Sequence, residues 1–354
     1  MAESKRVVVV GGGIAGAHVV RSLQFHANVT LIDPKEYFEI PWAMLRCMVE
    51  PKFAERSLCN HNDYLANARL IISSAASATD TDVVTESGER VPYDYLVIAT
   101  GSTFNGSISK QDRIKQFESD YDKISSARTV LIIGGGPTGV ELAAEIKVDF
   151  PEKKVVLIHK GSRLIDFLGP KASQKTLDWL VSKKVEVHLN EYIDLESLSE
   201  STTTYTTQNG MNIYADCHFV CVGRHVASSW LQNSVFKEYV DKQGHMKVDE
   251  SLRLRGKTNV FAVGDITDIK EIKQGFLAEK QAKVVVSNIQ ISLHGSNRKL
   301  KAYKAASPIA IVSLGRNAGV AQLPFGTFIG CLPGRIKSRD LFVGKTRKGL
   351  GIEP

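Results

Sequence analysis

The sequence predicts an α/β fold made of two doubly wound, Rossmann-like domains plus a C-terminal segment. Three observations lead to this prediction. A valine-rich strand runs into a glycine-rich turn at residues 6–16, and the same pattern recurs at residues 130–139. A third apolar stretch, at 259–265, ends in an acidic residue. Apolar strands that enter glycine turns and then helices are typical of parallel, doubly wound sheets.

Both glycine turns suit a backbone that holds a pyrophosphate. One glycine permits the tight turn, the next lets the backbone approach the phosphates, and the third lets the helix pack on the strand. The helix that follows offers free N–H groups and the positive end of its dipole. One such turn is a weak signal, but two copies in one chain indicate a flavin that exchanges electrons with a nicotinamide. The glycines assigned to the turns are Gly11, Gly13 and Gly16 in the first copy and Gly134, Gly136 and Gly139 in the second.

The residue that ends the following strand differs between the two copies. Asp33 ends the first, where a carboxylate accepts a hydrogen bond from a ribose hydroxyl, and this suits the adenosine half of FAD. The second copy has no acid there and offers His159, Lys160 and, slightly later, Arg163. Positive groups favour a 2′-phosphate, so we expect NADPH to be accepted as well as NADH. The alternative is that Lys160 and Arg163 are only solvated loop charges.

Length and composition indicate a globular protein of two or three domains. The chain has 354 residues and a net charge of +7, which is compatible with acidic partners such as an anionic membrane surface or nucleic acid. No apolar run reaches the roughly 18 residues of a membrane span, and no signal peptide is apparent. Ala2 stands where myristoylation needs a glycine. We expect a cytoplasmic protein that is at most peripheral on an organelle membrane, such as the mitochondrial outer membrane.

The positions of the two turns suggest how the chain is divided. The predicted parts are a FAD-binding domain at 1–110 and 225–300, an inserted NAD(P)H-binding domain at 111–224, and a C-terminal segment at 301–354. Short strands are expected over 70–100, and helices near 171–183 and at 275–291. The C-terminal segment is expected to hold strands of its own and a basic tail.

Small and acidic residues at strand ends extend the flavin assignment. One strand arrives at Gly101, whose small size avoids a clash with a cofactor. The strand at 259–265 ends in Gly264 and Asp265, where a carboxylate can hold the ribityl hydroxyls of a flavin; the alternative is an ordinary helix cap. The helix that begins near Gly275 would direct its positive end at the flavin ring.

Glu141 is the candidate catalytic residue, on the first turn of the second glycine-turn helix. A carboxylate there can accept a hydrogen bond from the nicotinamide amide and hold the ring over the flavin, because transfer demands a close, aligned approach. The alternative is an acid favoured by the helix dipole. For Glu145, one turn further on, that alternative or a polar contact between helices is the better interpretation. No metal-ligand cluster is apparent.

The five cysteines argue against a redox disulfide. Cys47 stands alone where one class of two-dinucleotide flavoproteins has a cysteine pair, and no Cys-x-x-Cys is present. Cys217 and Cys221 lie four apart on a predicted strand and are interpreted as buried thiols. Electrons should therefore pass from the flavin directly to the acceptor.

Over nearly its whole length, the chain resembles the flavoprotein NAD(P)H:quinone reductases related to apoptosis-inducing factor, of the ferroptosis-suppressor type. The stretches that carry the resemblance are 134–147, 151–159, 259–265, 313–319 and 337–343. It implies FAD held by Asp265, by Arg46 as a cation near the pyrophosphate, and by the backbone run Gly11, Gly12, Gly13, Ile14 and Ala15. It also implies a backbone contact near Ser73 and a lysine contact for which Lys110 is a rough match. Animal members carry a myristoylation glycine, from which Ala2 departs.

The activity implied is the two-electron reduction of a ubiquinone-like quinone by NAD(P)H through FAD. Two alternatives stay open: a signalling flavoprotein that binds nucleic acid, as suggested for apoptosis-inducing-factor relatives, and a reductase of monodehydroascorbate or of a small iron–sulfur protein.

The C-terminal tail combines apolar residues with a cluster of bases. The apolar residues are Phe325, Phe328, Ile329, Cys331 and Leu332, and the bases are Arg335, Lys337, Arg339, Lys345, Arg347 and Lys348. Such a sequence suits shallow contact with an anionic leaflet, from which a dissolved quinone could reach the flavin. The alternative is that the apolar residues pack on the FAD domain and the bases are solvated.

Overall fold

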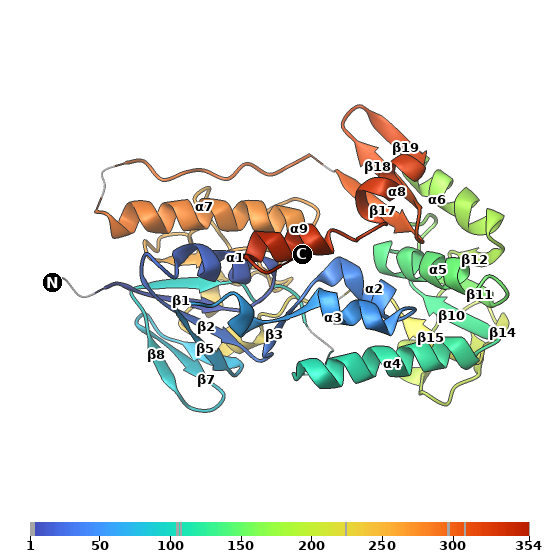
Figure 1. The fold of residues 1–354 in the computed structure, drawn as a ribbon, viewed down its shortest axis with the longest axis horizontal. Helices are drawn as coiled ribbons and strands as arrows, with labels where there is room; N and C mark the ends of the chain where they lie inside the picture. Colours follow the sequence, from blue (N-terminus) through green and yellow to red (C-terminus); the bar gives the residue numbers. More distant parts are fainter. Residues whose placement is uncertain are drawn as a thin grey trace.

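The computed structural model describes residues 4–103, 106, 108–223, 225–295, 298–307 and 309–353. Ala2 and the predicted domain boundary at residue 224 lie outside this part. Figure 1 shows two α/β bodies side by side, with the C-terminal segment extending over both. No helix in the described ranges is both long enough and apolar enough to cross a bilayer.

The first body is built on five parallel strands in the order β16-β9-β1-β2-β5. Their bounds are Arg6–Val10 (β1), Asn28–Asp33 (β2), Ala68–Ile72 (β5), Tyr95–Ile98 (β9) and Val260–Ala262 (β16). Helices α1 (Ile14–Leu23) and α7 (Gly275–Leu293) pack against each other beside this sheet. Because β16 pairs with β9, residues that flank the second body in sequence share one sheet and one core.

Smaller elements complete the first body. The expected short strands are an antiparallel group, β6 (Ala75–Ala78), β7 (Asp82–Thr85) and β8 (Arg90–Pro92). Strands β3 (Tyr37–Glu39) and β4 (Leu58–Asn60) pair antiparallel. The segment that connects them contains the short helices α2 (Met44–Cys47) and α3 (Ala54–Ser57). Helix α2 packs on α5 of the second body, because Leu45 in this helix and Val49 just after it belong to the hydrophobic core of the second body.

The second body repeats the plan with four parallel strands in the order β12-β11-β10-β15. Their bounds are Thr129–Ile133 (β10), Lys154–His159 (β11), Val185–Leu189 (β12) and Cys217–Val220 (β15). Helices α5 (Pro137–Asp149) and α6 (Pro170–Ser182) contribute to the core on one face, and the hairpin β13 (Thr204–Thr206) and β14 (Asn212–Tyr214) to that on the other.

Helix α4 (Lys110–Ser126) connects the bodies and had no counterpart among the sequence predictions. The Ser109 hydroxyl caps it by accepting a hydrogen bond from the Asp112 N–H at 3.2 Å. Only Arg113, Phe117 and Ile124 are buried along its 17 residues, so its apolar stripe is too thin to stand out in the sequence.

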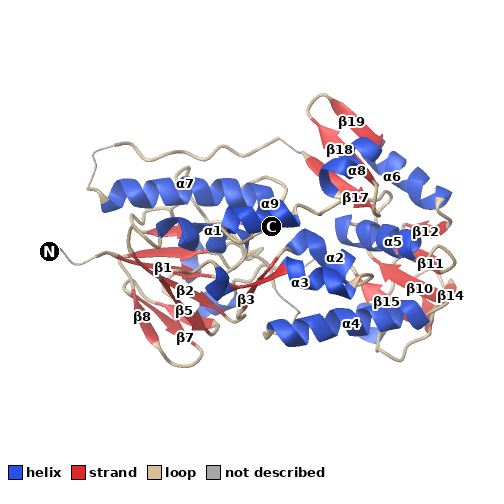
Figure 2. Cartoon of the chain, in the orientation of Figure 1, coloured by secondary structure: helices blue, strands red, loops and turns tan. Residues whose placement is uncertain are grey.

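The C-terminal segment spans both bodies (Figure 2). Its antiparallel strands β17 (Ala310–Leu314), β18 (Ala318–Leu323) and β19 (Gly326–Gly330) pack beside α5 and α6, whereas its last helix contacts α1. The residues described from sequence only as a basic tail form two helices, α8 (Cys331–Lys337) and α9 (Val343–Leu350).

Candidate functional site

The two glycine turns have the same geometry. Gly11 and Gly134 adopt φ angles of +101° and +119°, which L side chains rarely adopt. A Cβ on Gly11 would lie 2.5 Å from the carbonyl oxygen of Ala99, and one on Gly134 would lie 2.4 Å from that of Cys221. Each turn is therefore pressed against the end of the neighbouring strand, and only glycine fits.

The remaining motif glycines divide into packed and open positions. A Cβ on Gly16 or Gly139 would lie 1.8 Å from the carbonyl oxygen of Gly11 or Gly134, respectively, so each helix rests directly on its turn. A Cβ on Gly13 or on Gly136 would meet no atom within 4 Å. The backbone there is open, as close approach by a phosphate group requires.

Asp33 is 2% exposed at the end of β2 and faces the first turn. Its Oδ2 accepts a hydrogen bond from the Gly12 N–H, and its Oδ1 accepts from the N–H and Nζ of Lys35 at 2.7 and 3.1 Å. Burial raises the pKa of Asp33, but Lys35, His61 and the Gly12 N–H outweigh burial and leave it at about 2. Asp33 is thus an ionised acceptor at neutral pH, which suits a ribose hydroxyl.

His159 takes the equivalent place at the end of β11. Its Nδ1 accepts a hydrogen bond from the Gly135 N–H at 3.1 Å, so the ring proton lies on Nε2. That Nε2 is buried with no partner among the described residues. Burial also lowers the pKa of His159, so the ring is neutral at pH 7. His159 therefore offers a hydrogen bond rather than a charge.

The two nearby bases, Lys160 and Arg163, differ in their exposure and in their hydrogen bonds. Lys160 is exposed. The Arg163 guanidinium donates to the carbonyl oxygens of Leu168 and Asp166 at 2.8 and 2.6 Å, which ties it to its own loop. Arg163 is therefore held by its own loop, whereas Lys160 is exposed, and the contact of either base with a 2′-phosphate stays a prediction.

Gly264 and Asp265 follow β16, next to the first turn. Gly264 has a φ of +85°, and its N–H donates to Oε1 of Gln281 at 2.7 Å. An ideal Cβ at Gly264 would lie 3.7 Å from that of Ala15 in α1. The Asp265 carboxylate accepts a hydrogen bond from the Ser102 hydroxyl at 3.0 Å, one residue after Gly101. Asp265 is thus a half-buried carboxylate held beside α1, not a simple cap.

Two buried polar atoms at the start of α7 have no partner within the described ranges. They are Nε1 of Trp42 and Oε1 of Gln274, and the Trp42 ring is packed so tightly that a Cβ on Gly275 would meet it at 2.3 Å. Such orphaned groups are uncommon in folded proteins, and a bound polar molecule is one way to satisfy them. Together with the open backbone of Gly13 and the Asp265 carboxylate, they fit FAD.

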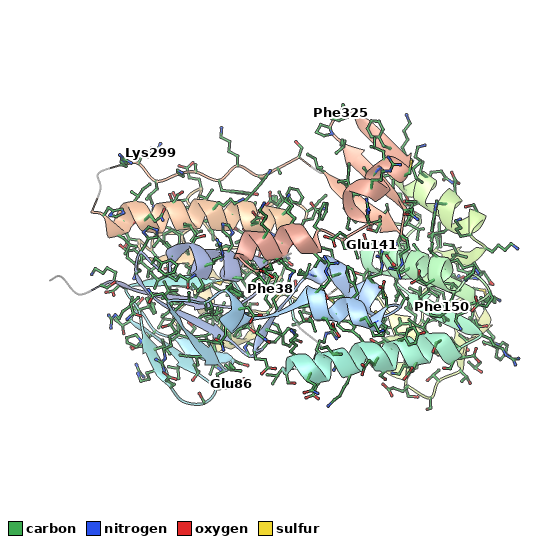
Figure 3. The ribbon with its side chains drawn as sticks, viewed as in Figure 1. Phe38, Glu86, Glu141, Phe150, Lys299 and Phe325 are labelled. Atoms are coloured by element: carbon green, nitrogen blue, oxygen red, sulfur yellow. The ribbon has the colours of Figure 1, made fainter. Side chains whose placement is uncertain are left out.

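Glu141 is 8% exposed, and the C-terminal segment binds it directly. Its Oε1 accepts hydrogen bonds from the Ser313 N–H at 2.7 Å and from Lys337 Nζ at 2.6 Å. Figure 3 shows Glu141 where α5 meets the C-terminal segment. Lys337 was counted among the bases that could contact an anionic leaflet, or else be solvated, but its Nζ is bound to Glu141. The contact with the nicotinamide stays a prediction.

Arg46 is engaged more fully than the sequence suggested. It is 2% exposed; its Nε and Nη2 donate to Glu145 at 2.6 and 2.9 Å, and Nη2 also donates to the Ser338 carbonyl oxygen at 3.0 Å. A pyrophosphate contact would have to come from the remaining nitrogen, Nη1. Glu145 makes the polar contact between helices that was one of its two interpretations.

Ser73 and Lys110 both lie close to the end of β2 in the first body. The Ser73 N–H donates to the Asp33 carbonyl oxygen at 3.1 Å, directly after β5. The Lys110 N–H donates to Oε1 of Glu36 at 2.8 Å, at the start of α4. The FAD contacts of both residues stay predictions.

The cysteines of the structure are free thiols. Burial raises the pKa of Cys47 to about 12 and that of Cys217 to about 11, so neither is a thiolate at neutral pH. Cys217 and Cys221 are half-buried, which corrects the expectation of buried thiols. Within the described ranges, no group of His, Cys, Asp and Glu side chains suits a metal ion.

Residues 5–282 match the model of the pyridine nucleotide-disulphide oxidoreductase family. The chain is 35% identical to ferroptosis suppressor protein 1 of Xenopus tropicalis and 33% identical to that of Homo sapiens; these alignments cover 99% and 98% of this chain and 96% of each relative. It is 31% identical to apoptosis-inducing factor homolog B of Dictyostelium discoideum, over 97% of this chain and 96% of the relative.

Solved structures share the fold at low sequence identity. The sulfide:quinone oxidoreductase of Aquifex aeolicus has a TM-score of 0.80 at 19% identity, covering 98% of this chain and 92% of that one. NDH2 of Plasmodium falciparum in complex with NADH has a TM-score of 0.77 at 15% identity, covering 98% of both chains. The predicted fold class is confirmed. The matches together favour an NAD(P)H-dependent flavin oxidoreductase over a protein that binds nucleic acid.

Proposed function

The chain belongs to the pyridine nucleotide-disulphide oxidoreductase family, and from this premise we propose that it reduces a ubiquinone-like quinone with NAD(P)H. Its cofactors are FAD and NAD(P)H. Bound FAD supplies an acceptor for two electrons from NAD(P)H and a donor of those electrons to the quinone. The balanced reaction converts NAD(P)H, a proton and a quinone into NAD(P)⁺ and a quinol.

One observation supports the proposal most directly. The two glycine turns have the same geometry, but the side chain that ends the following strand and binds each turn is different. In the first, the ionised Asp33 faces the turn and suits a ribose diol. In the second, the neutral His159 takes the same place, with the exposed Lys160 beside it. One chain thus offers two dinucleotide sites of different chemistry, as electron exchange between a flavin and a nicotinamide needs.

The residues proposed to act in the reaction have separate roles. Asp265 holds the ribityl chain, and the N-terminal end of α7 stabilises negative charge on the reduced ring. Glu141 orients the nicotinamide amide, and Lys337 fixes Glu141 through its 2.6 Å contact. The thiols with raised pKa values support direct transfer to the acceptor, without a disulfide relay.

A panel of electron acceptors tests this proposal. NADPH oxidation by the purified protein should be fastest with a water-soluble ubiquinone analogue, with one NADPH consumed per quinone. The Asp265→Ala variant should lose bound FAD and at least roughly tenfold in rate. A higher kcat/KM with monodehydroascorbate or a small iron–sulfur protein would favour those substrates instead.

We also propose that the C-terminal segment contacts an anionic membrane surface. Phe325, Phe328, Leu332 and Ile336 are 78%, 42%, 66% and 54% exposed, and Figure 3 shows Phe325 at the outer tip of the β18–β19 hairpin. Exposed apolar side chains near exposed bases suit a headgroup boundary. The bases that are exposed are Arg335, Arg339, Lys345 and Lys348.

A further inference from the structure

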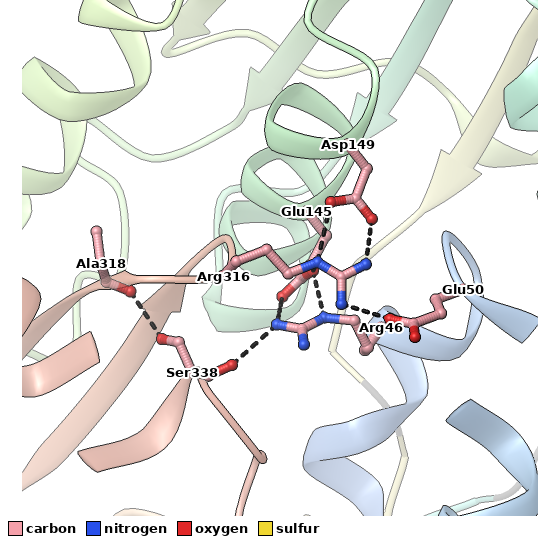
Figure 4. Close-up of polar contacts among 7 residues, drawn as sticks. All are labelled: Arg46, Glu50, Glu145, Asp149, Arg316, Ala318 and Ser338. Carbon is pink, nitrogen blue, oxygen red and sulfur yellow. Dashed lines mark hydrogen bonds and ion pairs between the residues drawn. The ribbon is translucent and has the colours of Figure 1, made fainter. Parts of the chain in front are cut away.

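Two arginines each join the first body, the second body and the C-terminal segment (Figure 4). The first is Arg46, which comes from α2. It binds Glu145 of α5 through two hydrogen bonds and the carbonyl oxygen of Ser338, directly after α8, through a third. Both side chains of the ion pair are only 2% exposed. The buried pair therefore connects all three parts at one point.

The second arginine, Arg316, comes from the turn between β17 and β18. Its Nε donates to Oδ1 of Asp149 at 2.9 Å, and its Nη2 binds Oδ2 of the same carboxylate. Its Nη1 binds Glu50, which follows α2. The Arg316 Nε also lies 4.0 Å from Oε2 of Glu145, so the two arginines share that carboxylate as a neighbour. Arg316 therefore repeats the three-part connection at the C-terminal end of α5.

These contacts fix the helix on which the nicotinamide site is built. Helix α5 begins at the open Gly136 turn, carries Glu141 one turn later, and carries Glu145 and Asp149 at the following two turns. Its first half therefore carries the groups proposed to bind the nicotinamide nucleotide, and its second half carries the two carboxylates that the arginines bind. Helix α2 belongs to the polypeptide between β3 and β4, which leads back to the FAD-binding body.

We propose that Arg46, Glu50, Glu145, Asp149 and Arg316 form an arginine clamp that holds the nicotinamide site at one fixed position relative to the flavin site. Electron transfer then needs no rotation of one body against the other. Because transfer depends on a close, aligned approach, a misplacement of about 1 Å can cost roughly 100-fold in rate. The clamp residues are positioning residues. The catalytic part of the inference rests on the proposed function.

Arg316 is the residue to change, because Arg46 is an expected FAD contact. Arg316→Gln removes the charge that bridges Glu50 and Asp149. Arg316→Lys keeps the charge but cannot bind both carboxylates in the same fork, so it should restore part of the function. Arg56→Gln is the matched control: Arg56 also links the first body to the C-terminal segment, by a 3.0 Å contact with Asp340, but both side chains are more than 40% exposed.

The first measurement is independent of catalysis. Spin labels introduced as noncanonical amino acids at Glu86 and Gln174, which are exposed on the two bodies, report the distance between them. The full-length protein should give one narrow distance distribution. Arg316→Gln should broaden it, and Arg56→Gln should not. An equally narrow distribution in Arg316→Gln, or a broad one in the unchanged protein, would overturn the clamp whether or not the proposed function is correct.

The second measurement uses FAD-loaded enzyme. At saturating NADPH, Arg316→Gln should slow flavin reduction by roughly 10- to 100-fold and weaken the long-wavelength charge-transfer band of reduced enzyme with NADP⁺. Reoxidation of dithionite-reduced enzyme by quinone should be unchanged. If Arg316→Gln does not fold, Glu50→Gln is the second variant. It removes only the contact between Arg316 and Glu50, so it should slow flavin reduction and weaken the band to a smaller extent. A lower melting temperature with unchanged reduction rate and band would make the contacts merely structural.

Discussion

Asp33 and His159 show how one position in a repeated fold is adapted to different ligands. Each side chain accepts a hydrogen bond from the second residue of its glycine turn. Asp33 stays ionised although it is buried, because Lys35, His61 and the turn N–H favour the charged form. For His159, burial outweighs the favourable contributions of Asp166 and the Arg163 backbone and lowers the pKa. The same backbone therefore presents a negative acceptor in one body and a neutral donor in the other.

The depressed pKa of Asp33 predicts how stability depends on pH. Because the folded pKa of about 2 lies below the ordinary 3.8, ionised Asp33 stabilises the folded protein above about pH 4, and this contribution is lost as the pH falls toward 2. The shift corresponds to about 2 kcal/mol. In the FAD-free protein, Asp33→Asn should lower the free energy of unfolding at pH 7 by about that amount. Between about pH 4 and pH 2, the free energy of unfolding of this variant should decrease less steeply than that of the parent protein.

Urea unfolding at a series of pH values measures this contribution. Asp178→Asn is the control, since Asp178 is exposed on α6 and only accepts a hydrogen bond from Gln174. An Asp33→Asn protein as stable as the parent at pH 7, with the same acid slope, would show that the buried carboxylate contributes nothing net.

We predict that the loop after β11 sets the preference between NADPH and NADH. With His159 neutral and Arg163 tied to two carbonyl oxygens, the exposed Lys160 is the residue that we predict to bind a 2′-phosphate. Lys160→Ala should therefore lower the NADPH-to-NADH ratio of kcat/KM by roughly tenfold, the lower end of the range for a hydrogen bond to a charged group. Arg163→Gln should change it less.

Adding His159→Asp to Lys160→Ala should shift the preference further toward NADH, because a carboxylate repels the phosphate and accepts the 2′-hydroxyl. Steady-state kinetics with both nucleotides measure the ratio. An unchanged ratio in the double variant would remove this loop from the site.

Several elements could be predicted from the sequence because local signals specify them. Both glycine turns, α6 and α7 lie where strand, turn and helix patterns place them. Helix α4 was missed because its buried stripe is thin. The pairs Arg46–Glu145 and Lys337–Glu141 join residues 99 and 196 positions apart, and no local pattern reveals such contacts. The sequence therefore predicts the cofactor-binding units but not the contacts that fix them relative to one another.

Over the whole molecule, the proposed membrane contact predicts selective binding to anionic lipid. The full chain should sediment with vesicles that contain phosphatidylserine, and the binding should weaken with salt. Changing Arg335, Arg339, Lys345 and Lys348 to glutamine should reduce it by roughly 1 kcal/mol for each base that lies near the surface. Lys337 and Arg347 stay unchanged, because they contact Glu141 and Cys59. Equal sedimentation with neutral vesicles, or none at low salt, would contradict the contact.

The central claim is that one chain passes electrons from NAD(P)H through FAD to a quinone. Anaerobic rapid mixing tests it most directly, because the flavin's visible absorbance reports both half-reactions. NADPH should bleach the FAD with one nucleotide consumed per flavin, and a ubiquinone analogue added next should restore the absorbance with one quinol formed. Flavin that NADPH does not bleach, or that the quinone leaves bleached, would contradict the account.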